Sequence, residues 1–350
     1  MSSKNQTESG TIAVEMVLPA IGEPETLVLR RRALPAPRKG EVIVRVEATG
    51  VSFAEKSMRR GRYPGQPAFP FVPGYDVVGV IAQRGPGEFE LGQRVAAVTK
   101  AGGWTDHIVL AAKDLVVVPE GLSAVDAETA VVNGVTAWQM LYDVARIRQG
   151  QTILVHGATS GVGVLLVQLA RLAGLRVLGT ASPAKHDALR ALGAEPLDYH
   201  ADVEAVVKAM APGGVDAVFD HLGGPSLDSS WRLLGPGGVL VSYALATKLD
   251  ETDSLLLAFL AHLTKVMWWN ALPNGRRAHF YNMWSGKTTQ PRAFQKKLRD
   301  AIGQVFALLA DGRIEARVGG ILPLERAAEA LRLAESGTVV GKVVIVPGRL

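Results

Sequence analysis

Residues 155–163 read Val-His-Gly-Ala-Thr-Ser-Gly-Val-Gly, between an apolar segment typical of a strand, Thr152–His156, and a segment typical of a helix, Val162–Ala173. Glycines in such a loop let the backbone approach a phosphate and let the helix pack closely on the strand. The N–H groups at the start of a helix bind a pyrophosphate. The run therefore predicts a dinucleotide-binding loop, in which the residues expected to touch the cofactor are Ala158, Thr159, Ser160, Gly161, Val162 and Gly163.

Segments typical of strands and of helices alternate from this loop onward. The expected strands are Thr152–His156, Arg176–Gly179, 196–198, Asp216–Phe219 and Val239–Ser242, and the expected helices are Val162–Ala173, Pro183–Leu192, Asp202–Met210 and Ser226–Leu234. Regular alternation of this kind predicts a parallel sheet with helices on both faces. The predicted fold class is therefore α/β, with a Rossmann-type, doubly wound parallel sheet.

The segment from Thr11 to about Ala124 differs, because Gly and Pro break it into short strand-like runs, which predicts a β-rich, barrel-like domain. A helix is expected at Ala127–Asp143, and the later part of the chain contains a candidate edge strand, Ala278–Met283, a long helix, Pro291–Ala310, and a β-rich ending. We expect a first domain at 1–125, with 1–10 as a flexible tail. The dinucleotide-binding domain is expected at 126–290 and a return to the first domain at 291–350, with the chemistry at their interface.

The composition excludes several classes of function. Of the 350 residues 48% are apolar and 20% are charged, which is typical of a packed protein. The net charge is +5, but Lys and Arg are dispersed and no basic run is interleaved with aromatics, so we expect no nucleic-acid partner. With no cysteine, and with seven histidines that lack ligand spacing, no metal site is expected. The polar N-terminus shows no signal peptide, which predicts a cytoplasmic location.

The most apolar segment of the chain is Ser254–Leu272. A membrane span needs about 20 nearly uninterrupted apolar residues, and His262, Lys265 and Asn270 interrupt this one. We therefore expect no transmembrane segment. The segment is interpreted as a buried helix, a wall of the active site or a subunit contact, and contact with a membrane surface is a weaker alternative.

The end of the second strand bears on the choice of cofactor. An enzyme that uses NAD usually carries Asp or Glu there to bind the ribose hydroxyl, whereas this chain reads Leu178-Gly179-Thr180-Ala181-Ser182. With Ser182 and Lys185 at this place, a 2′-phosphate would meet a hydroxyl and an ammonium. The sequence thus predicts NADPH. The alternative makes Ser182 the N-cap of a helix that starts at Pro183, and Lys185 a surface residue.

Several runs along the chain together resemble a known family. They are 48–55 (Ala-Thr-Gly-Val-Ser-Phe-Ala-Glu), 59–64 (Arg-Arg-Gly-Arg-Tyr-Pro), 71–79 (Phe-Val-Pro-Gly-Tyr-Asp-Val-Val-Gly), 134–137 (Gly-Val-Thr-Ala), 156–163 and 341–344 (Gly-Lys-Val-Val). From about Val14 to Val346 the chain resembles the zinc-free quinone oxidoreductases of the medium-chain dehydrogenase/reductase superfamily. This branch includes zeta-crystallin and the vesicle-membrane quinone-reductase-like proteins.

The resemblance implies a GroES-like, β-rich catalytic domain beside the Rossmann domain, and it implies roles for particular residues. Carried over by position, the residues at the nicotinamide end are Asn133, Thr136, Ser242, Tyr243 and Ala244, and those at the adenosine 2′-phosphate are Ser182, Lys185 and Tyr199. Tyr63 matches the active-site tyrosine, a hydrogen-bond donor to the acceptor oxygen, and Ser52 is a candidate wall residue. Ser52 stands where the family commonly has Asn, Glu55 where it has Asp, and Asp76 where it has Glu.

These observations predict an NADPH-dependent oxidoreductase that transfers hydride to a quinone or a similar electrophilic carbonyl compound without a metal. One alternative is an NADPH-dependent alkenal or enoyl double-bond reductase. Another is an NADPH-binding protein with little turnover, structural or associated with a membrane. We also expect a homodimer that pairs the edge strand near Ala278–Met283 with its symmetry mate. Arg59 is a candidate cofactor-binding or structural cation, but a surface position is favoured for it.

Overall fold

The computed structural model describes residues 10–87, 89–244, 246 and 255–348, so all but the last residue of the expected tail lies outside the described residues. Contacts within the chain divide it into two compact units. The first unit comprises Met1–Glu128, Gly320–Glu335 and Val343–Leu350, and the second comprises Thr129–Gly319 and Ser336–Lys342.

The first unit is rich in β-structure, as predicted. Its larger sheet has the strand order β14-β15-β3-β4-β5-β7, with β6 paired to β3, and a second sheet pairs β1 with β2. The strands are β1 (Ile12–Val17), β2 (Val28–Ala33), β3 (Glu41–Val51), β4 (Asp76–Arg84), β5 (Arg94–Val98), β6 (His107–Ala111), β7 (Val116–Val117), β14 (Val318–Pro323) and β15 (Lys342–Val346). The inward side chains of β3, β4 and β5 form one core cluster that includes Val44, Val77 and Val95. Ile43, between two residues of this cluster on β3, belongs instead to a cluster with Ala13 and Leu34, so both faces of this strand are buried.

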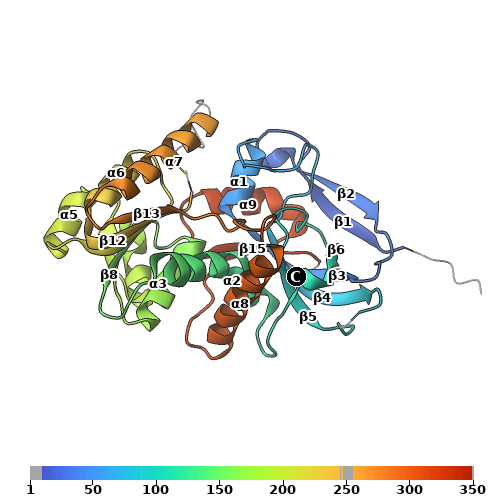
Figure 1. Cartoon of the computed structure of the whole chain (residues 1–350). Coiled ribbons are helices and arrows are strands. Elements are labelled where there is room, and N and C mark those ends of the chain that lie inside the picture. The colour runs from blue at the N-terminus through green and yellow to red at the C-terminus, as the bar shows by residue number, and fades with distance from the viewer. Residues whose placement is uncertain (1–9, 88, 245, 247–254, 349–350) are drawn as a thin grey trace, which may run out of the picture. The chain divides into compact units, whose positions relative to one another are not determined.

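The end of the chain returns to the N-terminal strands (Figure 1). β15 pairs antiparallel with β3, so that Val343 lies opposite Val51. Helix α9 (Ala327–Glu335) contacts α1 (Phe53–Arg59). Arg59, expected at the surface, is only 2% exposed. Its guanidinium donates to the carbonyl of Gly22 at 2.7 Å and to the Glu335 carboxylate, because a buried arginine needs partners for its charge.

The second unit contains the predicted doubly wound sheet, which confirms the fold class. All its strands are parallel, in the order β10-β9-β8-β11-β12-β13. They are β8 (Thr152–Val155), β9 (Arg176–Ala181), β10 (Glu195–Asp198), β11 (Val215–Asp220), β12 (Leu234–Ser242) and β13 (Arg277–Phe280). Chain order reverses between β8 and β11, and a crevice for ligands forms at such a switch point, outside the carboxyl ends of the strands.

The helices of this unit are α3 (Gly161–Leu172), α4 (His186–Leu192), α5 (Val203–Met210), α6 (Pro225–Arg232), α7 (Leu255–Ala271) and α8 (Pro291–Ala310), and α2 (Ala124–Trp138) leads into it. The helix expected at Ala127–Asp143 changes at its end into a π-helical turn, Gln139–Ala145. The one expected at Pro183–Leu192 opens instead as a 3₁₀ turn, Pro183–Lys185. The sheet packs against α6 and α7, where Leu240 and Trp269 share one core cluster.

Helix α7 occupies most of the apolar segment and is buried on one face only. Trp269 is 6% exposed and stacks on Trp231 with ring centroids 4.9 Å apart. On the other face Met267 is 73% exposed and Trp268 is 65% exposed. None of the described helices has the length and the hydropathy that crossing a bilayer requires.

Candidate active site

The glycine-rich loop lies at the carboxyl end of β8 and is tied to β9. Gly157 has φ +60°, a conformation that glycine adopts at no steric cost. Its N–H donates to the Thr180 hydroxyl at 2.9 Å, and the N–H of Ala158 donates to the Thr180 carbonyl at 3.0 Å. A Cβ atom on Gly157 would lie 2.4 Å from Cε1 of His221. The loop is thus fixed against two neighbouring strand ends.

The start of α3 faces the same loop. Ser160 caps the helix, and its hydroxyl accepts a hydrogen bond from the N–H of Gly163 at 3.1 Å. A Cβ atom on Gly163 would lie 2.4 Å from the carbonyl oxygen of Gly157. On Gly161 it would lie 2.5 Å from Nδ2 of Asn133. The backbone contact at Gly163 leaves no room for a side chain, whereas at Gly161 the Asn133 side chain would have to move to admit one. The first N–H groups of α3, including that of Val162, could bind a phosphate.

A segment from the end of the chain borders the loop. The N–H of Gly341 donates to the carbonyl of Thr159 at 3.0 Å, and Gly341 forms a parallel bridge with Ser160. Gly341 has φ +92°, and a Cβ atom there would lie 1.8 Å from the carbonyl oxygen of Arg317. The sequence reasoning used Gly341 only as part of the family resemblance, because nothing in one sequence joins residues this far apart.

The three residues expected at the 2′-phosphate come from the ends of β9 and β10, which are neighbours in the sheet. Ser182 occupies the N-cap position before the 3₁₀ turn at Pro183, as in the alternative interpretation. Its side chain, however, makes no capping hydrogen bond. The Lys185 ammonium donates to the Val339 carbonyl at 2.9 Å, and burial lowers the pKa of Lys185. An ammonium has three donors, so others remain for a ligand. Tyr199 is 52% exposed.

Asn133 and Thr136 both lie on α2, and both are buried. Asn133 packs against Gly161, as described above. Thr136 contacts the Tyr281 hydroxyl, which itself donates to Oε1 of Gln139 at 2.9 Å. The π-helical turn carries Gln139, and Tyr281 follows β13, so this contact joins α2 to the carboxyl edge of the sheet.

A buried carboxylate, Asp220, lies at the carboxyl end of β11 and is fully paired. It accepts hydrogen bonds of 2.7–3.0 Å from the N–H groups of Leu222 and Gly223 and from the hydroxyls of Ser226 and Ser230. Nε2 of His156 lies 3.1 Å from the Ser230 oxygen, which makes the ring the donor, because that hydroxyl is already committed to Asp220. Burial alone would raise the pKa of Asp220, but His156 and these donors outweigh burial and lower it.

Three polar atoms beside Asp220 are buried and have no hydrogen-bond partner among the described residues. They are Nδ1 of His221, Oγ of Ser242 and the hydroxyl of Tyr243. The His221 ring bonds to the backbone of His156, and burial lowers the pKa of His221 to about 4, so the ring is neutral. A buried polar atom without a partner costs about 1–3 kcal/mol. Buried polar atoms without a partner indicate a place where a ligand could complete the hydrogen bonds.

Helix α7 adds a further unpaired group. His262 is 4% exposed, and neither of its ring nitrogens has a partner among the described residues. Its ring meets that of Phe280, at the end of β13, edge to face at 5.2 Å. Burial lowers the pKa of His262. The sequence reasoning noted this histidine only as an interruption of an apolar run.

In the first unit, Ser52 caps α1 together with Glu55. The Ala54 N–H donates to the Ser52 hydroxyl, and one Glu55 oxygen accepts from both the hydroxyl and the N–H of Ser52, at 2.5 and 2.8 Å. Glu55 is 2% exposed. Burial raises the pKa of Glu55 to about 7, and the nearby Asp76 adds to this rise. The two positions where this chain departs from the family's usual acids are therefore electrostatically linked.

Tyr63 lies in the loop after α1. Its hydroxyl contacts that of Tyr75, and the two rings meet edge to face at 5.8 Å. The ammonium of Lys100 lies 5.9 Å from the centre of the Tyr63 ring. This pairing could not be predicted, because Tyr75 and Lys100 lie in loops, and the conformation of a loop has no periodic signal in the sequence.

Several residues near the expected site were missed by sequence reasoning. Asp220, His221 and Tyr281 were not considered as site residues, although each ends or directly follows a strand at the carboxyl edge. That position was the available signal, since ligands of open α/β sheets bind there. Ala244, which was predicted, is half-buried two residues after β12.

Metal ligands were sought across the part of the chain that the structure describes. There, no three His, Cys, Asp or Glu side chains are grouped so that they could hold a metal ion. The full sequence contains no cysteine.

Comparisons with known proteins match parts of both units. Residues 38–120 match the family described as alcohol dehydrogenase GroES-like domain, and residues 192–345 match the one described as zinc-binding dehydrogenase. The human synaptic vesicle membrane protein VAT-1 homolog is 31% identical over 350 residues, which cover 95% of this chain and 86% of that protein.

Two solved structures extend the likeness. A mycobacterial protein complexed with NADPH has a TM-score of 0.81 and 26% identity, with 96% of this chain and 100% of that chain covered. The quinone oxidoreductase of Pseudomonas syringae has a TM-score of 0.81 and 27% identity over the same shares. The resemblance inferred from the sequence is confirmed. The chain is an oxidoreductase and belongs to the medium-chain dehydrogenase/reductase superfamily, in the zinc-free quinone oxidoreductase branch to which the VAT-1 homologues are related.

Proposed function

We propose that this protein uses NADPH to transfer a hydride to a quinone or a similar electrophilic carbonyl compound, without a metal. The observation that carries the proposal is the group of unpaired buried atoms on His221, Ser242 and Tyr243, beside a glycine loop able to bind a pyrophosphate. A bound dinucleotide would give these atoms partners and remove the cost of their burial. A solved relative with NADPH bound supports the choice of ligand.

The preference for NADPH over NADH rests on the end of β9. No acidic residue lies in Leu178–Ser182 to repel a 2′-phosphate. Ser182 keeps its hydroxyl out of any capping bond, and Lys185 keeps donors beyond the one used by Val339. These groups together would bind a phosphate through charge-assisted hydrogen bonds.

The proposed class of hydride acceptor follows from a reaction in which no metal acts as a Lewis acid. A metal stabilises charge on a carbonyl oxygen by several kcal/mol, and acceptors that take hydride readily need this help least. Quinones and α,β-unsaturated carbonyl compounds are of this kind. Tyr63 would donate a hydrogen bond to the acceptor oxygen, and Ser52 would form part of the wall around the acceptor.

Binding of the cofactor can be tested by titrating the protein with NADPH and with NADH. We expect tighter binding of NADPH, and we expect Lys185→Met to weaken it by roughly 1.5–3 kcal/mol, the usual range for a charged hydrogen bond, with little change for NADH. Lys208→Met is the control, because Lys208 pairs with Glu204 at the surface of the same unit. Equal affinity of the unmutated protein for both cofactors would contradict the preference.

Turnover is tested by following NADPH oxidation with a panel of quinones and a panel of enones. Faster reduction of quinones supports the proposal, and faster reduction of enones makes the protein a double-bond reductase. No turnover with either panel, despite tight binding of NADPH, makes it a binding protein. A chelator should leave the activity intact, and restoration of chelated enzyme by zinc would contradict a reaction without metal.

A homodimer is also part of this proposal. β13 is the edge strand of the six-stranded sheet and pairs on one side with β12. An edge strand with free backbone groups is a liability unless it is paired, and pairing with a symmetry mate would satisfy both copies. Light scattering at low micromolar concentration should give the mass of two chains, and the mass of one chain would refute the dimer.

A further inference from the structure

The Tyr63 hydroxyl has a buried partner in the same unit. Tyr75 is 4% exposed, whereas Tyr63 is half-buried, and the two hydroxyl oxygens are in hydrogen-bond contact. A buried tyrosine hydroxyl normally finds such a partner. Either oxygen can act as donor, so the Tyr63 hydroxyl can release its proton while the Tyr75 hydroxyl turns to donate to it.

Lys100 is held beside this pair by an unfavourable backbone conformation. It has φ +67°, and among the described residues only one other non-glycine residue, Arg146, has a positive φ. Backbone strain of this kind persists where surrounding contacts impose it, and it is concentrated at functional sites. The Lys100 N–H donates to the Tyr75 carbonyl at 3.1 Å, which ties this strained residue to the tyrosine pair.

The ammonium of Lys100 lies close to the backbone of Gly65. A Cβ atom on Gly65 would lie 3.2 Å from the Lys100 nitrogen, and Gly65 itself has φ +65°. The ammonium lies 5.9 Å from the Tyr63 ring centre, at the outer limit of a cation–π contact.

We propose that Tyr75 and Lys100 are positioning residues that enable Tyr63 to act as the proton donor of the reaction. This inference rests on the proposed function. NADPH, when bound, supplies the hydride that leaves negative charge on the acceptor oxygen. The Tyr63 O–H bond then breaks, and a new O–H bond forms on that oxygen. The phenolate left on Tyr63 accepts a hydrogen bond from Tyr75 and is stabilised by the Lys100 charge, until water returns the proton.

The test measures kcat, KM and the solvent isotope effect with a quinone acceptor for four variants. We expect Tyr75→Phe and Lys100→Met each to lower kcat by roughly tenfold or more, within the range of general acid catalysis, with little change in KM. The solvent isotope effect should rise in both, because proton delivery becomes the slower step. Lys100→Arg, which keeps the charge, should recover most of the rate. Lys113→Met, which removes an exposed lysine of the same unit, is the control.

The affinity for NADPH and the thermal midpoint are measured on the same samples, so that a loss of folding is recognised. If the wild type turns over but the variants keep its kcat and its isotope effect, the inference is overturned while the proposed function stands. If Lys100→Arg is as slow as Lys100→Met, the charge is not what matters and Lys100 is only structural. If the wild type oxidises NADPH with neither quinones nor enones, the proposed function fails and the inference with it.

Discussion

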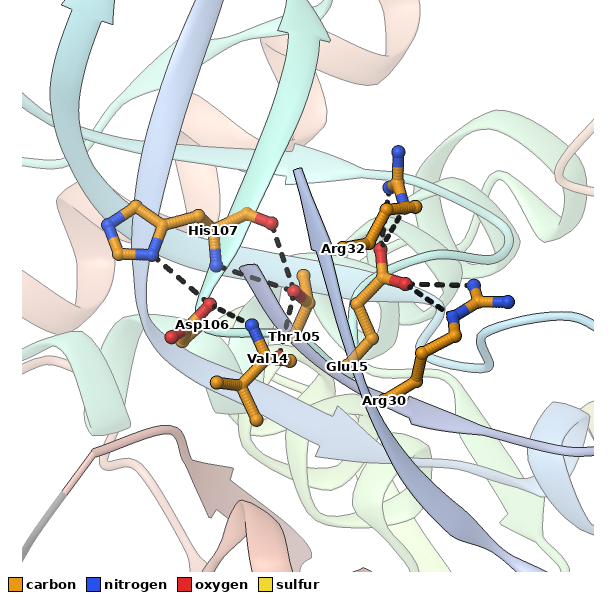
Figure 2. Close-up of polar contacts among 7 residues, drawn as sticks. All are labelled: Val14, Glu15, Arg30, Arg32, Thr105, Asp106 and His107. Carbon is orange, nitrogen blue, oxygen red and sulfur yellow. Dashed lines mark hydrogen bonds and ion pairs between the residues drawn. The ribbon is translucent and has the colours of Figure 1, made fainter. Parts of the chain in front are cut away.

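Each unit contains a buried polar cluster, and the two clusters differ in how many of their polar atoms have a hydrogen-bond partner. In the first unit Glu15, on β1, lies between two arginines of β2 (Figure 2). Its carboxylate receives two hydrogen bonds from Arg30 and two from Arg32, at 2.5–3.2 Å. Burial alone would raise the pKa of Glu15, but these bonds outweigh burial and lower it. Beside it, Asp106 accepts a hydrogen bond from the Val14 N–H at 2.8 Å.

At the carboxyl edge of the sheet in the second unit, the Asp220 carboxylate is hydrogen-bonded as completely as that of Glu15. However, His221, Ser242 and Tyr243 around it each have a buried atom with no partner in the part of the chain that the structure describes. Pairing within the chain is what a structural cluster needs, since its only task is to hold strands together. Unpaired atoms in a well-packed unit indicate a place where a ligand completes the network.

The largest effect is expected where the loop has no room for a side chain. Gly163→Ala would place a methyl group 2.4 Å from the Gly157 carbonyl, which is backbone and cannot move away cheaply. We expect the NADPH dissociation constant to rise by roughly 100-fold or more, because misplaced loop N–H groups no longer meet the pyrophosphate.

The control for this variant is Gly303→Ala in α8, where a Cβ atom would meet nothing within 4 Å. It should stabilise the protein by about 0.5–1 kcal/mol, since alanine favours helix more than glycine does. Unchanged NADPH affinity in Gly163→Ala would show that the loop does not bind the dinucleotide.

The second effect concerns the paired cluster. Glu15→Ala removes four hydrogen bonds and leaves two arginines facing each other, so we expect the free energy of unfolding to fall by about 2–3 kcal/mol. Denaturant unfolding measures this change. The affinity for NADPH should stay the same, and a parallel loss of affinity would contradict a purely structural role for the cluster.

Features that depend on neighbouring residues in the sequence could be predicted, whereas contacts between distant residues could not. Helix α8 was predicted with its observed bounds, because Pro291 begins it and Asp311-Gly312 follow its end. The glycine loop was found because its glycines stand in one short run between an apolar strand and a helix. The contacts of His221 with Gly157, and of Tyr63 with Tyr75, could not be predicted, because they depend on how strand ends and loops meet in space. The domain boundaries at residues 125 and 290 stay predictions.

The third effect tests Glu55, a buried acid of the first unit whose Oε1 atom has no hydrogen-bond partner among the described residues. Its pKa is about 7 in the folded protein against an ordinary value of 4.5. Between these values the folded state keeps a proton that the unfolded chain has released, so stability falls as pH rises through this window. Glu55→Gln mimics the protonated form. Its advantage over the wild type should therefore grow from near zero at about pH 4.5 to about 1–3 kcal/mol at pH 8.

Urea unfolding at several pH values measures this difference. Tyr63→Phe serves as a control in the same unit and should shift stability by the same amount at every pH across this range. A Glu55→Gln advantage that does not depend on pH would mean that Glu55 is ionised in the folded protein throughout, contrary to the burial that surrounds it.

The smallest effect comes from two serines that are both completely buried but differ in their partners. The Ser230 hydroxyl donates to Asp220 and lies next to Nε2 of His156, whereas the Ser242 hydroxyl has no partner among the described residues. Removing a paired hydroxyl leaves its partners unsatisfied, and removing an unpaired one relieves the cost of burying it. Without a ligand, Ser230→Ala should therefore destabilise the protein, and Ser242→Ala should stabilise it by about 1 kcal/mol.

Saturating NADPH should change this result for one serine only. If the cofactor supplies the missing partner, the advantage of Ser242→Ala shrinks or reverses when NADPH is bound, because the variant forgoes about 0.5–1.5 kcal/mol of hydrogen bonding. The effect of Ser230→Ala should be the same with and without NADPH. If Ser242→Ala stabilises the protein equally with and without saturating NADPH, the unpaired hydroxyl does not face the cofactor. An unpaired buried atom would then not mark the ligand site at this position.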